Sequence, residues 1–448
     1  MTPTDLIKKY NVAAPRYTSY PTVPYWETEQ WSQEEYLLSV RKAYGESEQE
    51  GISIYVHLPF CESLCTYCGC TTRITRNHRV EEPYIEAVIA EWRMYAAVLG
   101  GQPRVREIHL GGGTPTFFTP ANLGRLMKGL LEDAVITEGA EFSFEAHPNN
   151  TTVEHLQVLY DFGFRRLSLG IQDFDPAVQE IINRRQTVGQ VEQVTRQARE
   201  MGYTSINYDL IYGLPLQKLH SVENTVREVI RLRPDRIAFY SYAHVPWIKP
   251  GQRSFTEADL PGDGEKRKLY ERGRGMFLEA GYSDIGMDHF ALPTDSLYAA
   301  GEQGTLHRNF MGYTHQYTRL CVGLGVSAIG DSWYAFGQNI KVVEPYLKAI
   351  AEGRFPVFRG HLLTEDDLVH RREILGIMCR GTAGLDGETV RRIGDRLLPL
   401  REDELIALED GRLTVTEKGR AFLRNICMAF DERLWQRQPE SQIFSTAV

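Results

Sequence analysis

Four cysteines gather in the short segment 61–70, whose sequence is CESLCTYCGC. Three of them, Cys61, Cys65 and Cys68, are separated by three and then two residues. Thiolates crowded into one short loop repel each other and oxidise easily, so a bound group is expected to hold them. Cysteine thiolates select soft metal centres, which are zinc, copper(I) or iron–sulfur clusters. The spacing therefore predicts a metal centre at this loop.

The same spacing favours an iron–sulfur cluster over zinc. Structural zinc takes four ligands in a closed tetrahedron, typically from two well-separated pairs. Cys70 lies one residue beyond Cys68, too close to complete a relaxed tetrahedron easily, although His57 could serve in its place. A four-iron cluster on three thiolates would instead leave one iron without a protein ligand, free to hold a small molecule. We expect such a cluster, with zinc as the alternative, and an open iron is a site for chemistry.

The elements that would position this loop alternate regularly from residue 51 onwards. Apolar runs typical of strands alternate with segments of helical spacing, which argues for parallel βα units. Six such units, with no dinucleotide fingerprint after the first strand, predict an α/β fold with an incomplete (β/α)6 TIM-like barrel rather than a doubly wound sheet. The expected strands are 52–58, 107–110, 141–145, 166–172, 205–211 and 236–242, and the expected helices are 83–99, 121–131, 153–161, 176–201 and 265–280.

Polar residues stand at or near the C-terminal ends of several of these strands. They are Glu145, Gln172, Asp209 and Tyr242. In a barrel those strand ends share one face, where active sites are built. The Cys loop and the segment 111–115, with sequence GGGTP, also follow strands, and glycines let backbone N–H groups approach a ligand closely. We interpret this face as the functional site.

The remaining segments suggest further divisions of the chain. Residues 1–50 form an N-terminal arm around the sequence RYTSYPT, which either packs on the surface or acts as a lid that touches a ligand. Residues 51–290 hold the partial barrel, and 291–355 are expected to complete it. Residues 356–448 are expected to form a mainly α-helical C-terminal domain with a winged-helix-like element. A packing role is expected there, because no basic recognition helix is evident.

Composition argues against several classes of function. The chain has 448 residues and a formal net charge of −9 without a run of Lys or Arg, so we expect no nucleic-acid partner. Its first 26 residues have no apolar stretch typical of a secretory signal. The longest apolar run, 320–330, is far shorter than the roughly 20 residues that span a bilayer. Because the cysteines form no spread-out disulfide framework, we expect a soluble cytoplasmic protein.

With these residues in place, the chain resembles a known family. The spacing of the three cysteines is the signature of radical S-adenosylmethionine (SAM) enzymes, and GGGTP looks like their methionine-binding strand end. Over nearly its whole length the chain is similar to the oxygen-independent coproporphyrinogen III oxidases. It departs from that pattern at Leu110, where the family often has Trp, and at His147, where it often has Asp. The matching segments are RYTSYPT from Arg16, YVHLPFC from Tyr55, CGC ending at Cys70, LSLGIQDF from Leu167, DLIYGLP from Asp209, GMDHFA from Gly286, LHRNFMGYT from Leu306, GLGVSAIG from Gly323 and RNICM from Arg424.

The resemblance implies an activity together with its cofactors and partners. The activity is anaerobic conversion of two propionate side chains of coproporphyrinogen III to vinyl groups, giving protoporphyrinogen IX in haem synthesis. The implied cofactors are a 4Fe-4S cluster on Cys61, Cys65 and Cys68, and SAM, with two molecules bound. The implied partners are the tetrapyrrole substrate and an electron donor such as flavodoxin or ferredoxin. The resemblance also implies a monomer.

Family positions carried onto this chain imply the binding residues. The positions for one SAM are Tyr55, Gly112, Glu145 and Ile329, and a carboxylate such as Glu145 suits a cationic ammonium group. The positions for the second SAM are Tyr67, Gly113, Thr114, Gln172, Arg184, Asp209 and Ala243. Asp209 can accept from ribose hydroxyls, and Arg184 can bind a carboxylate with its planar fork.

The tetrapyrrole substrate carries four carboxylates and therefore needs cations in its site. Candidates are Arg16, Lys249 and Arg308. The N-terminal arm would close over this flat substrate, presenting Arg16 together with the aromatic faces of Tyr17, Tyr20 and Tyr25.

Three other functions are compatible with part of this pattern. A haem-trafficking relative, or haem chaperone, would bind the cluster and SAM without the decarboxylase activity. Such relatives usually lack the RYTSYPT arm and the counterpart of Cys70, and this chain has both. A related methyltransferase opens haem with similar machinery. A plain electron-transfer iron–sulfur protein would need neither an open iron nor a wide barrel mouth, so the whole pattern favours the oxidase.

Overall fold

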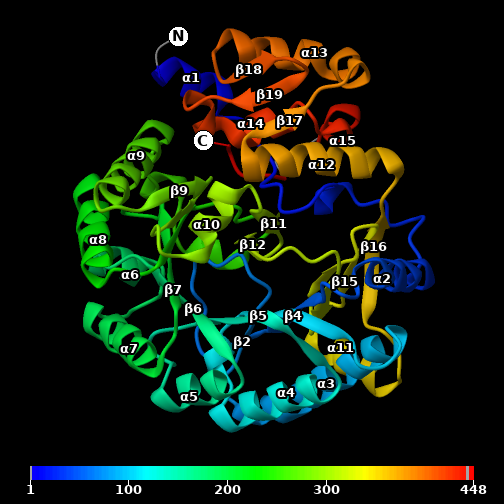
Figure 1. The fold of residues 1–448 in the computed structure, drawn as a ribbon. Helices are drawn as coiled ribbons and strands as arrows, with labels where there is room; N and C mark the ends of the chain where they lie inside the picture. Colours follow the sequence, from blue (N-terminus) through cyan, green and yellow to red (C-terminus); the bar gives the residue numbers. More distant parts are fainter. Residues whose placement is uncertain (1–2, 440–442, 448) are drawn as a thin grey trace.

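Six parallel strands form the centre of the fold. The computed structural model describes residues 3–439 and 443–447 (Figure 1). The central strands pair in chain order, and every one of these pairings is parallel, as crossover helices require. The expected incomplete (β/α)6 barrel is confirmed. Its strands are β1 (Ile52–Leu58), β4 (Arg104–Gly112), β5 (Val135–Ala146), β6 (Phe164–Gln172), β7 (Ser205–Tyr212) and β8 (Arg236–Ser241).

Shorter strands extend this sheet on both sides without closing it. Beside β1 lies the parallel strand β13 (Cys321–Leu324), which the antiparallel strands β14 (Ile329–Asp331), β15 (Ala335–Asn339) and β16 (Val357–Leu362) follow. Beside β8 lie the antiparallel strands β10 (His289–Ala291) and β9 (Ser283–Gly286). Within the described residues, β16 and β9 are the two edges of one twelve-stranded sheet and do not pair with each other. The barrel is therefore open.

Helices cover the outer face of the sheet (Figure 1). Threonine side chains cap three of them by accepting a backbone N–H, with Thr119 before α4, Thr152 before α5 and Thr187 before α7. Among the described residues, no helix is both long and apolar enough to cross a bilayer. The outer helices are α3 (Glu81–Val98), α4 (Pro120–Glu132), α5 (Val153–Asp161), α6 (Pro176–Ile181), α7 (Val188–Met201), α8 (Leu219–Leu232), α9 (Asp263–Glu279) and α11 (Val343–Ala351).

The single helix expected over 176–201 is wrong, because the structure has two helices with a connection at 182–187. Asp175 accepts from the backbone N–H groups of Ala177 and Val178 and so begins α6. Thr187 and Gln190 form a reciprocal capping box that begins α7. Asn183 between them has a left-handed backbone with φ of 51°, which ends the first helix. As a result, residues 182–187 turn toward the Cys loop.

Alternation along the strands separates an apolar outer face from a polar inner face. In β5, Phe142 is buried in the main hydrophobic core, whereas Ser143 and Glu145 line an interior cavity. In β7, Tyr208 is buried in the same core and Asp209 lines the cavity. Because successive side chains of a strand point to opposite faces, the outer residues pack against the helices. The inner residues are left to serve the cavity.

A second hydrophobic core joins the N-terminal arm to the C-terminal region. Leu6 and Tyr10 of α1 (Pro3–Tyr10) are buried in it beside Ile377 and Ile426. Figure 1 shows α1 beside the C-terminal elements, while α2 (Gln33–Ser47) lies against the sheet near β15 and β16. The C-terminal elements are α12 (Glu365–Arg380), α13 (Gly387–Glu402), α14 (Leu423–Met428), α15 (Glu432–Gln436) and an antiparallel sheet of β17 (Thr382–Gly384), β19 (Arg412–Val415) and β18 (Ile406–Glu409). Between these elements and the barrel lie α10 (Ser296–Gln303) and the hairpin of β11 (His307–Asn309) and β12 (Gly312–Thr314).

Two tyrosines of the arm are buried in this second core. Tyr17 and Tyr20 are each only 2% exposed, and the hydroxyl of Tyr17 donates to Asp431 at 3.1 Å. Tyr25 stacks on Phe444 and donates its hydroxyl hydrogen to the carbonyl of Arg437. The expectation that Tyr17 and Tyr20 present aromatic faces to the substrate is wrong. Their apolar area is buried to anchor the arm on the C-terminal helices.

One buried arginine ties the arm to the last described residues. Arg424 donates Nε to the carbonyl of Pro15 at 3.0 Å and Nη1 to the carbonyl of Thr446 at 2.7 Å. Its Nη2 donates to the carbonyl of Ser445 at 3.0 Å and to that of Ala14. The side chain is buried, so these carbonyls replace water as its acceptors. We call this set of contacts the Arg424 clamp.

Candidate active site

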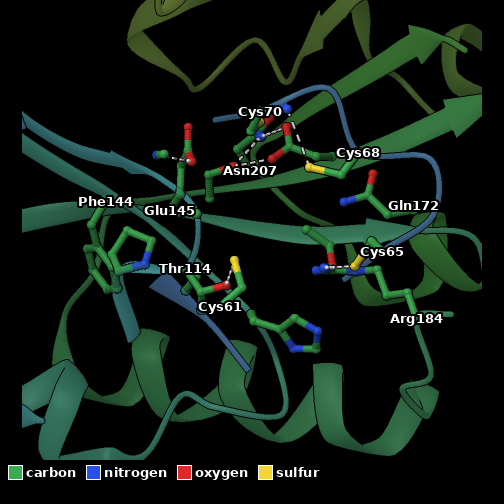
Figure 2. Close-up of a pocket in the computed structure, with 18 of the residues that line it drawn as sticks. Cys61, Cys65, Cys68, Cys70, Thr114, Phe144, Glu145, Gln172, Arg184 and Asn207 are labelled. Carbon is green, nitrogen blue, oxygen red and sulfur yellow. Dashed lines mark hydrogen bonds between the residues drawn. The ribbon is translucent and has the colours of Figure 1, made fainter. Parts of the chain in front are cut away.

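A cavity of about 520 Å³ lies at the C-terminal ends of the parallel strands, and the Cys loop forms one of its walls. Figure 2 shows the sulfurs of Cys61, Cys65 and Cys68 arranged around one common space, with Glu145 on another side of it and Arg184 beside Cys65. The cavity brings together most of the residues named from the sequence. Those that line it are Cys61, Cys65, Cys68, Tyr67, Gly112, Gly113, Thr114, Glu145, Gln172, Arg184 and Asp209.

Each thiol of the Cys loop has a polar neighbour. The hydroxyl of Thr114 lies 3.3 Å from the sulfur of Cys61, and Nη1 of Arg184 lies 3.7 Å from the sulfur of Cys65. The sulfur of Cys68 accepts from the backbone N–H of Cys70 at 3.4 Å. Hydrogen-bond donors and cations around thiolates stabilise their negative charge. The hydrogen bonds of Cys70 lower the pKa of Cys68 to about 6, whereas burial raises the pKa of Cys61 to about 11 in spite of its contact with Thr114.

The donor geometry fits a cluster better than a single metal ion. Among the described residues, no three His, Cys, Asp or Glu side chains converge closely enough to hold one ion. His57 does not supply the fourth ligand that zinc would need, because its Nε2 lies 2.8 Å from the carbonyl of Thr71 and its Nδ1 lies 3.1 Å from the hydroxyl of Tyr55. Three thiols around a shared space match a multi-atom 4Fe-4S group, with one iron left for another ligand.

The glycine segment at the end of β4 packs against the Cys loop. A Cβ atom on Gly113 would lie 2.7 Å from the carbonyl of Pro59 and 3.0 Å from the sulfur of Cys61. Gly112 has φ of 115°, and its backbone N–H donates to Glu145 at 3.2 Å. Only glycine allows this approach and this backbone conformation. The segment thereby joins the cysteines to the carboxylate on the neighbouring strand.

Glu145 is an ionised carboxylate at the end of β5. Burial alone would raise its pKa, but the hydrogen bond and charge of His109 and the N–H of Gly112 hold the pKa below its usual value. Nε2 of His109 lies 3.5 Å from the carboxylate, and Nδ1 of His109 lies 2.7 Å from the hydroxyl of Ser143. This chain of contacts fixes the histidine ring beside the carboxylate. Glu145 is therefore ready to accept from a cationic group in the cavity.

Asp209 on β7 is held by two neighbours of different elements. Its carboxylate accepts from the hydroxyl of Ser168 at 2.8 Å and from the amide of Asn207 at 2.9 Å. Burial, together with the charge of Glu145, raises the pKa of Asp209 to about 6 in spite of these donors. Two carboxylates on one cavity wall favour a ligand with donor groups, such as an ammonium or hydroxyls.

The connection between α6 and α7 carries Arg184 into the cavity. Its Nη2 donates to the carbonyl of Gly170 at 2.6 Å, which orients the guanidinium along the end of β6. Its Nε is buried and has no hydrogen-bond partner among the described residues. Gln172, which ends β6, has φ of 66° and turns its side chain toward the same space (Figure 2). An unsatisfied buried N–H is costly, so Arg184 is suited to an anionic ligand.

A second cavity of about 360 Å³ lies behind Glu145. Tyr55, Ser327 and Ile329 line it, and Glu145 and His109 line both cavities. The ring of Tyr55 is stacked on the ring of His109, with centroids 6.0 Å apart and an angle of 15° between the planes. Tyr55 and Ile329 are thus close to the carboxylate that the sequence grouped with them.

Ala243, Lys249, Arg16 and Arg308 lie outside both cavities. So does Tyr242, which was expected at the functional face and is instead buried in a small apolar cluster with Leu214 and Phe255. The carbonyl of Ala243 accepts from Gln252, and Lys249 donates to the carbonyl of Cys70 at 3.3 Å. Arg16 donates to the carbonyl of Ser241 at 2.8 Å, and Arg308 is buried behind the arm, where one of its nitrogens lies 3.5 Å from the carbonyl of Arg16. The structure therefore puts two of the three substrate candidates together and Lys249 apart, beside the Cys loop.

Polar residues in the middle of the strands were not predicted as part of the site. His109, Ser143, Ser168 and Asn207 all line the cavity and contact Glu145 or Asp209 or one of their partners. Alternation in the sequence could have revealed them, because each of these residues stands two positions from another polar residue in an otherwise apolar strand. Barrel interiors are normally filled by branched apolar residues, so this polar layer marks a binding space.

An open parallel barrel with three thiols of this spacing at its strand ends defines a radical SAM enzyme, which uses a 4Fe-4S cluster and SAM. In agreement, residues 55–229 match the family model of the radical SAM superfamily. The oxygen-independent coproporphyrinogen III oxidase of Escherichia coli is 39% identical to the chain, and the alignment covers 96% of this chain and 95% of the relative. The oxygen-independent coproporphyrinogen III oxidase of a Synechocystis strain is 35% identical, and that alignment covers 99% of this chain and 97% of the relative.

A solved structure agrees with these relatives. The structure of the Escherichia coli coproporphyrinogen III oxidase, described as a radical SAM enzyme, matches with a TM-score of 0.89 and 37% identity over 96% of this chain and 98% of that chain. The chain belongs to the family of the oxygen-independent coproporphyrinogen III oxidases. Two departures from the family pattern, at Leu110 and His147, leave the three thiols and Glu145 in place.

Proposed function

We propose that this protein catalyses the anaerobic oxidative decarboxylation of two propionate side chains of coproporphyrinogen III, giving the vinyl groups of protoporphyrinogen IX. Each step removes one hydrogen atom from the propionate β-carbon, releases carbon dioxide and passes one electron to an acceptor. The observation that carries the proposal is the three-thiol cavity in a chain that matches the oxidases along its whole length. When bound, the cluster and SAM supply methionine and a 5′-deoxyadenosyl radical by reductive cleavage of SAM.

The residues of the chain hold these groups in the proposed enzyme. Cys61, Cys65 and Cys68 bind the cluster, and Glu145 accepts from the ammonium group of one SAM beside Gly112, Tyr55 and Ile329. A second SAM takes the side of the cavity where Asp209 can accept from ribose hydroxyls and Arg184 can bind a carboxylate. The place of Asp209 on the cavity wall and the unpaired Nε of Arg184 support these two roles. Tyr67, Gly113, Thr114 and Gln172 line the same space, with Ala243 near it.

The substrate carboxylates would meet cations where the arm contacts the barrel, namely Arg308 of β11 and Arg16 of the arm, which also lies 3.5 Å from Asp288. Arg308 is only 5% exposed, and its Nε and Nη1 have no partner among the described residues. Arg16 covers it, and lies 6.0 Å from the ring centroid of Tyr240, which lines the main cavity. Buried guanidinium donors without an acceptor suit a carboxylate. Lys249, beside the Cys loop, is a third candidate for another propionate.

An assay of the purified holoenzyme tests the proposal. Under anaerobic conditions with SAM, dithionite and coproporphyrinogen III, we expect protoporphyrinogen IX, seen as protoporphyrin after oxidation and chromatography. A protein that consumes SAM yet binds haem and leaves the porphyrinogen unchanged would be a haem chaperone. Methylated or opened haem would identify the methyltransferase. Either result would overturn the oxidase.

The proposed enzyme also needs a one-electron donor, and we propose a small acidic protein such as flavodoxin or ferredoxin. Two cations lie beside the Cys loop, and one of them, Arg73, is paired with Glu344. Arg73 lies on β3 (Arg73–Ile74), which pairs with β2 (Phe60–Cys61), and Lys249 donates to Cys70. Positive charge next to the cluster ligands favours encounter with an acidic carrier. The assay with reduced flavodoxin in place of dithionite tests this part of the proposal.

We also propose that the protein is a monomer in the cytoplasm and has no nucleic-acid partner. The net charge of −9 and the lack of a Lys or Arg run support the last point. Sedimentation of the holoenzyme at several concentrations tests the first, and cell fractionation tests the location.

Arg16→Ala tests whether the arm belongs to the substrate site. We expect the variant to keep its iron and its SAM affinity, because neither depends on the arm. The KM for coproporphyrinogen should rise about tenfold or more, since a hydrogen bond to a charged group contributes about 1.5–3 kcal/mol. Lys8→Ala, which changes an exposed cation of the same arm, is the matched control. An unchanged KM in both variants would refute the substrate role of Arg16.

A further inference from the structure

Two buried polar side chains on α3 connect the Cys-loop strand to the loop that carries Ile329. Tyr84 and Glu91 are both 0% exposed and lie two turns apart on α3. Neither lines the main cavity or the second cavity. A buried carboxylate must have strong hydrogen bonds to persist, so its partners indicate what it does.

Glu91 accepts three hydrogen bonds, and two of their donors hold the same loop in place. Oε2 accepts from the backbone N–H of Gly325 at 2.8 Å and from the hydroxyl of Tyr346 at 2.7 Å. Oε1 accepts from the amide of Asn339 at 2.6 Å, and the same amide nitrogen donates to the carbonyl of Gly325 at 2.9 Å. Glu91 and Asn339 therefore hold both backbone groups of Gly325, at the start of the 325–328 loop between β13 and β14.

Tyr84 joins the next residue of that loop to the end of β1. Its hydroxyl donates to the carbonyl of His57 at 2.7 Å and accepts from the backbone N–H of Val326 at 2.9 Å. The contact is tight, because a Cβ atom on Gly325 would lie 2.6 Å from the carbonyl of His57 and 2.6 Å from the hydroxyl of Tyr84. His57 comes four residues before Cys61. One hydroxyl thus spans the gap between the strand that leads to the cysteines and the 325–328 loop.

The loop that these two residues hold provides one wall of the second cavity. Ser327, with a left-handed φ of 59°, and Ile329 line it beside Tyr55. On its other side the loop is fixed by backbone bonds from Ser327 N–H to Ile340 and from Asn339 N–H to Ala328. The position of Ile329 relative to Tyr55 and Glu145 therefore depends on contacts made from α3.

We propose that Glu91 and Tyr84 are positioning residues for SAM: they lock the 325–328 loop against the end of β1 and so set the width of the space between Ile329 and Glu145. The inference depends on the proposed SAM site but not on the identity of the tetrapyrrole. A carboxylate is the matched group at position 91, since all three partners of Glu91 are donors. Glutamine would turn one of its acceptors into a donor facing a donor.

Glu91→Gln and Tyr84→Phe in the iron-loaded protein test the proposal, with Tyr346→Phe as the matched control. Tyr346→Phe removes a hydrogen bond from the same buried carboxylate but touches no loop atom. SAM affinity by anaerobic titration is expected to fall roughly tenfold in the first two variants and to stay unchanged in the control. Amide hydrogen exchange without SAM should become faster at Gly325 and Val326 in the first two variants only, and all three should keep their iron.

Parent-like SAM affinity in Glu91→Gln and Tyr84→Phe would overturn the positioning role, and so would an equal loss in Tyr346→Phe. Gly325→Ala tests the same gap without changing α3, because its added methyl group would push the loop from His57. It should weaken SAM binding in the same direction, and parent-like affinity there would also contradict the proposal if Glu91→Gln fails to fold. All of these readouts precede turnover. A failure of the oxidase assay in the unmodified protein would therefore stay distinguishable.

Discussion

Replacing any one of Cys61, Cys65 and Cys68 by serine is expected to remove most of the iron from the anaerobically purified protein and to abolish SAM cleavage. The three sulfurs surround one space in the main cavity, where Thr114 lies 3.3 Å from the sulfur of Cys61 and Arg184 lies 3.7 Å from that of Cys65. A serine hydroxyl is a much harder and less acidic ligand, and clusters of this class rely on thiolates. Iron analysis, absorbance and 5′-deoxyadenosine release measure the effect.

Cys70→Ser is the matched control for these three variants. Its residue belongs to the same loop and donates a backbone N–H to the sulfur of Cys68, a bond that serine preserves. We expect the variant to keep its cluster, because three ligands already suffice. Loss of iron in Cys70→Ser would show that the ligands were assigned wrongly, and so would full iron content in the other three variants.

Glu145→Ala is expected to keep the iron–sulfur absorbance and to lower SAM affinity by roughly ten- to 150-fold. A hydrogen bond to a charged group contributes about 1.5–3 kcal/mol, which corresponds to that range. The effect is expected because His109 and Gly112 hold this carboxylate ionised and open to the cavity. An anaerobic titration with SAM measures it.

Glu138→Ala, an exposed acid of the same strand, is the control for Glu145→Ala. It removes the same charge from β5 without changing the cavity, so SAM affinity should not change. Equal SAM affinity in Glu145→Ala and the parent protein would show that Glu145 does not bind SAM and is only a solvated residue at the end of the strand.

Local signals were enough to predict the central part of the fold. The six parallel strands each have an apolar run that ends in polar residues, and a strand in a βα unit reveals itself within a few residues. Glu145 and Asp209 were therefore placed correctly at the cavity from their positions in the strands. The spacing of Cys61, Cys65 and Cys68 likewise placed them at one site, and they line the same cavity.

Other features depended on information that a local pattern does not carry. The sequence of 176–201 was interpreted as one helical pattern, so the break that contains Arg184 was not predicted. The caps at Asp175 and Thr187 begin two separate helices there. Aromatic residues such as Tyr17 and Tyr20 are typical both of a lid that binds a ligand and of a segment anchored in a core. Their role was decided by partners more than 350 residues away, such as Asp431. Glu91 is one of several acids in its helix, and the hydrogen bonds that set it apart come from the distant Asn339 and Gly325.

The Arg424 clamp makes the melting of the C-terminal region a reporter of events in the barrel. Since one guanidinium holds residues 14–15 and 445–446 together, the arm cannot detach while the clamp is intact. Arg16 is the next residue along the chain and bonds to Ser241 at the end of β8. A ligand that engages Arg16 stabilises every segment that must separate before the ligand is released, by an amount that grows with its concentration. A thermal shift recorded far from the cysteines would thus register occupancy of the active site.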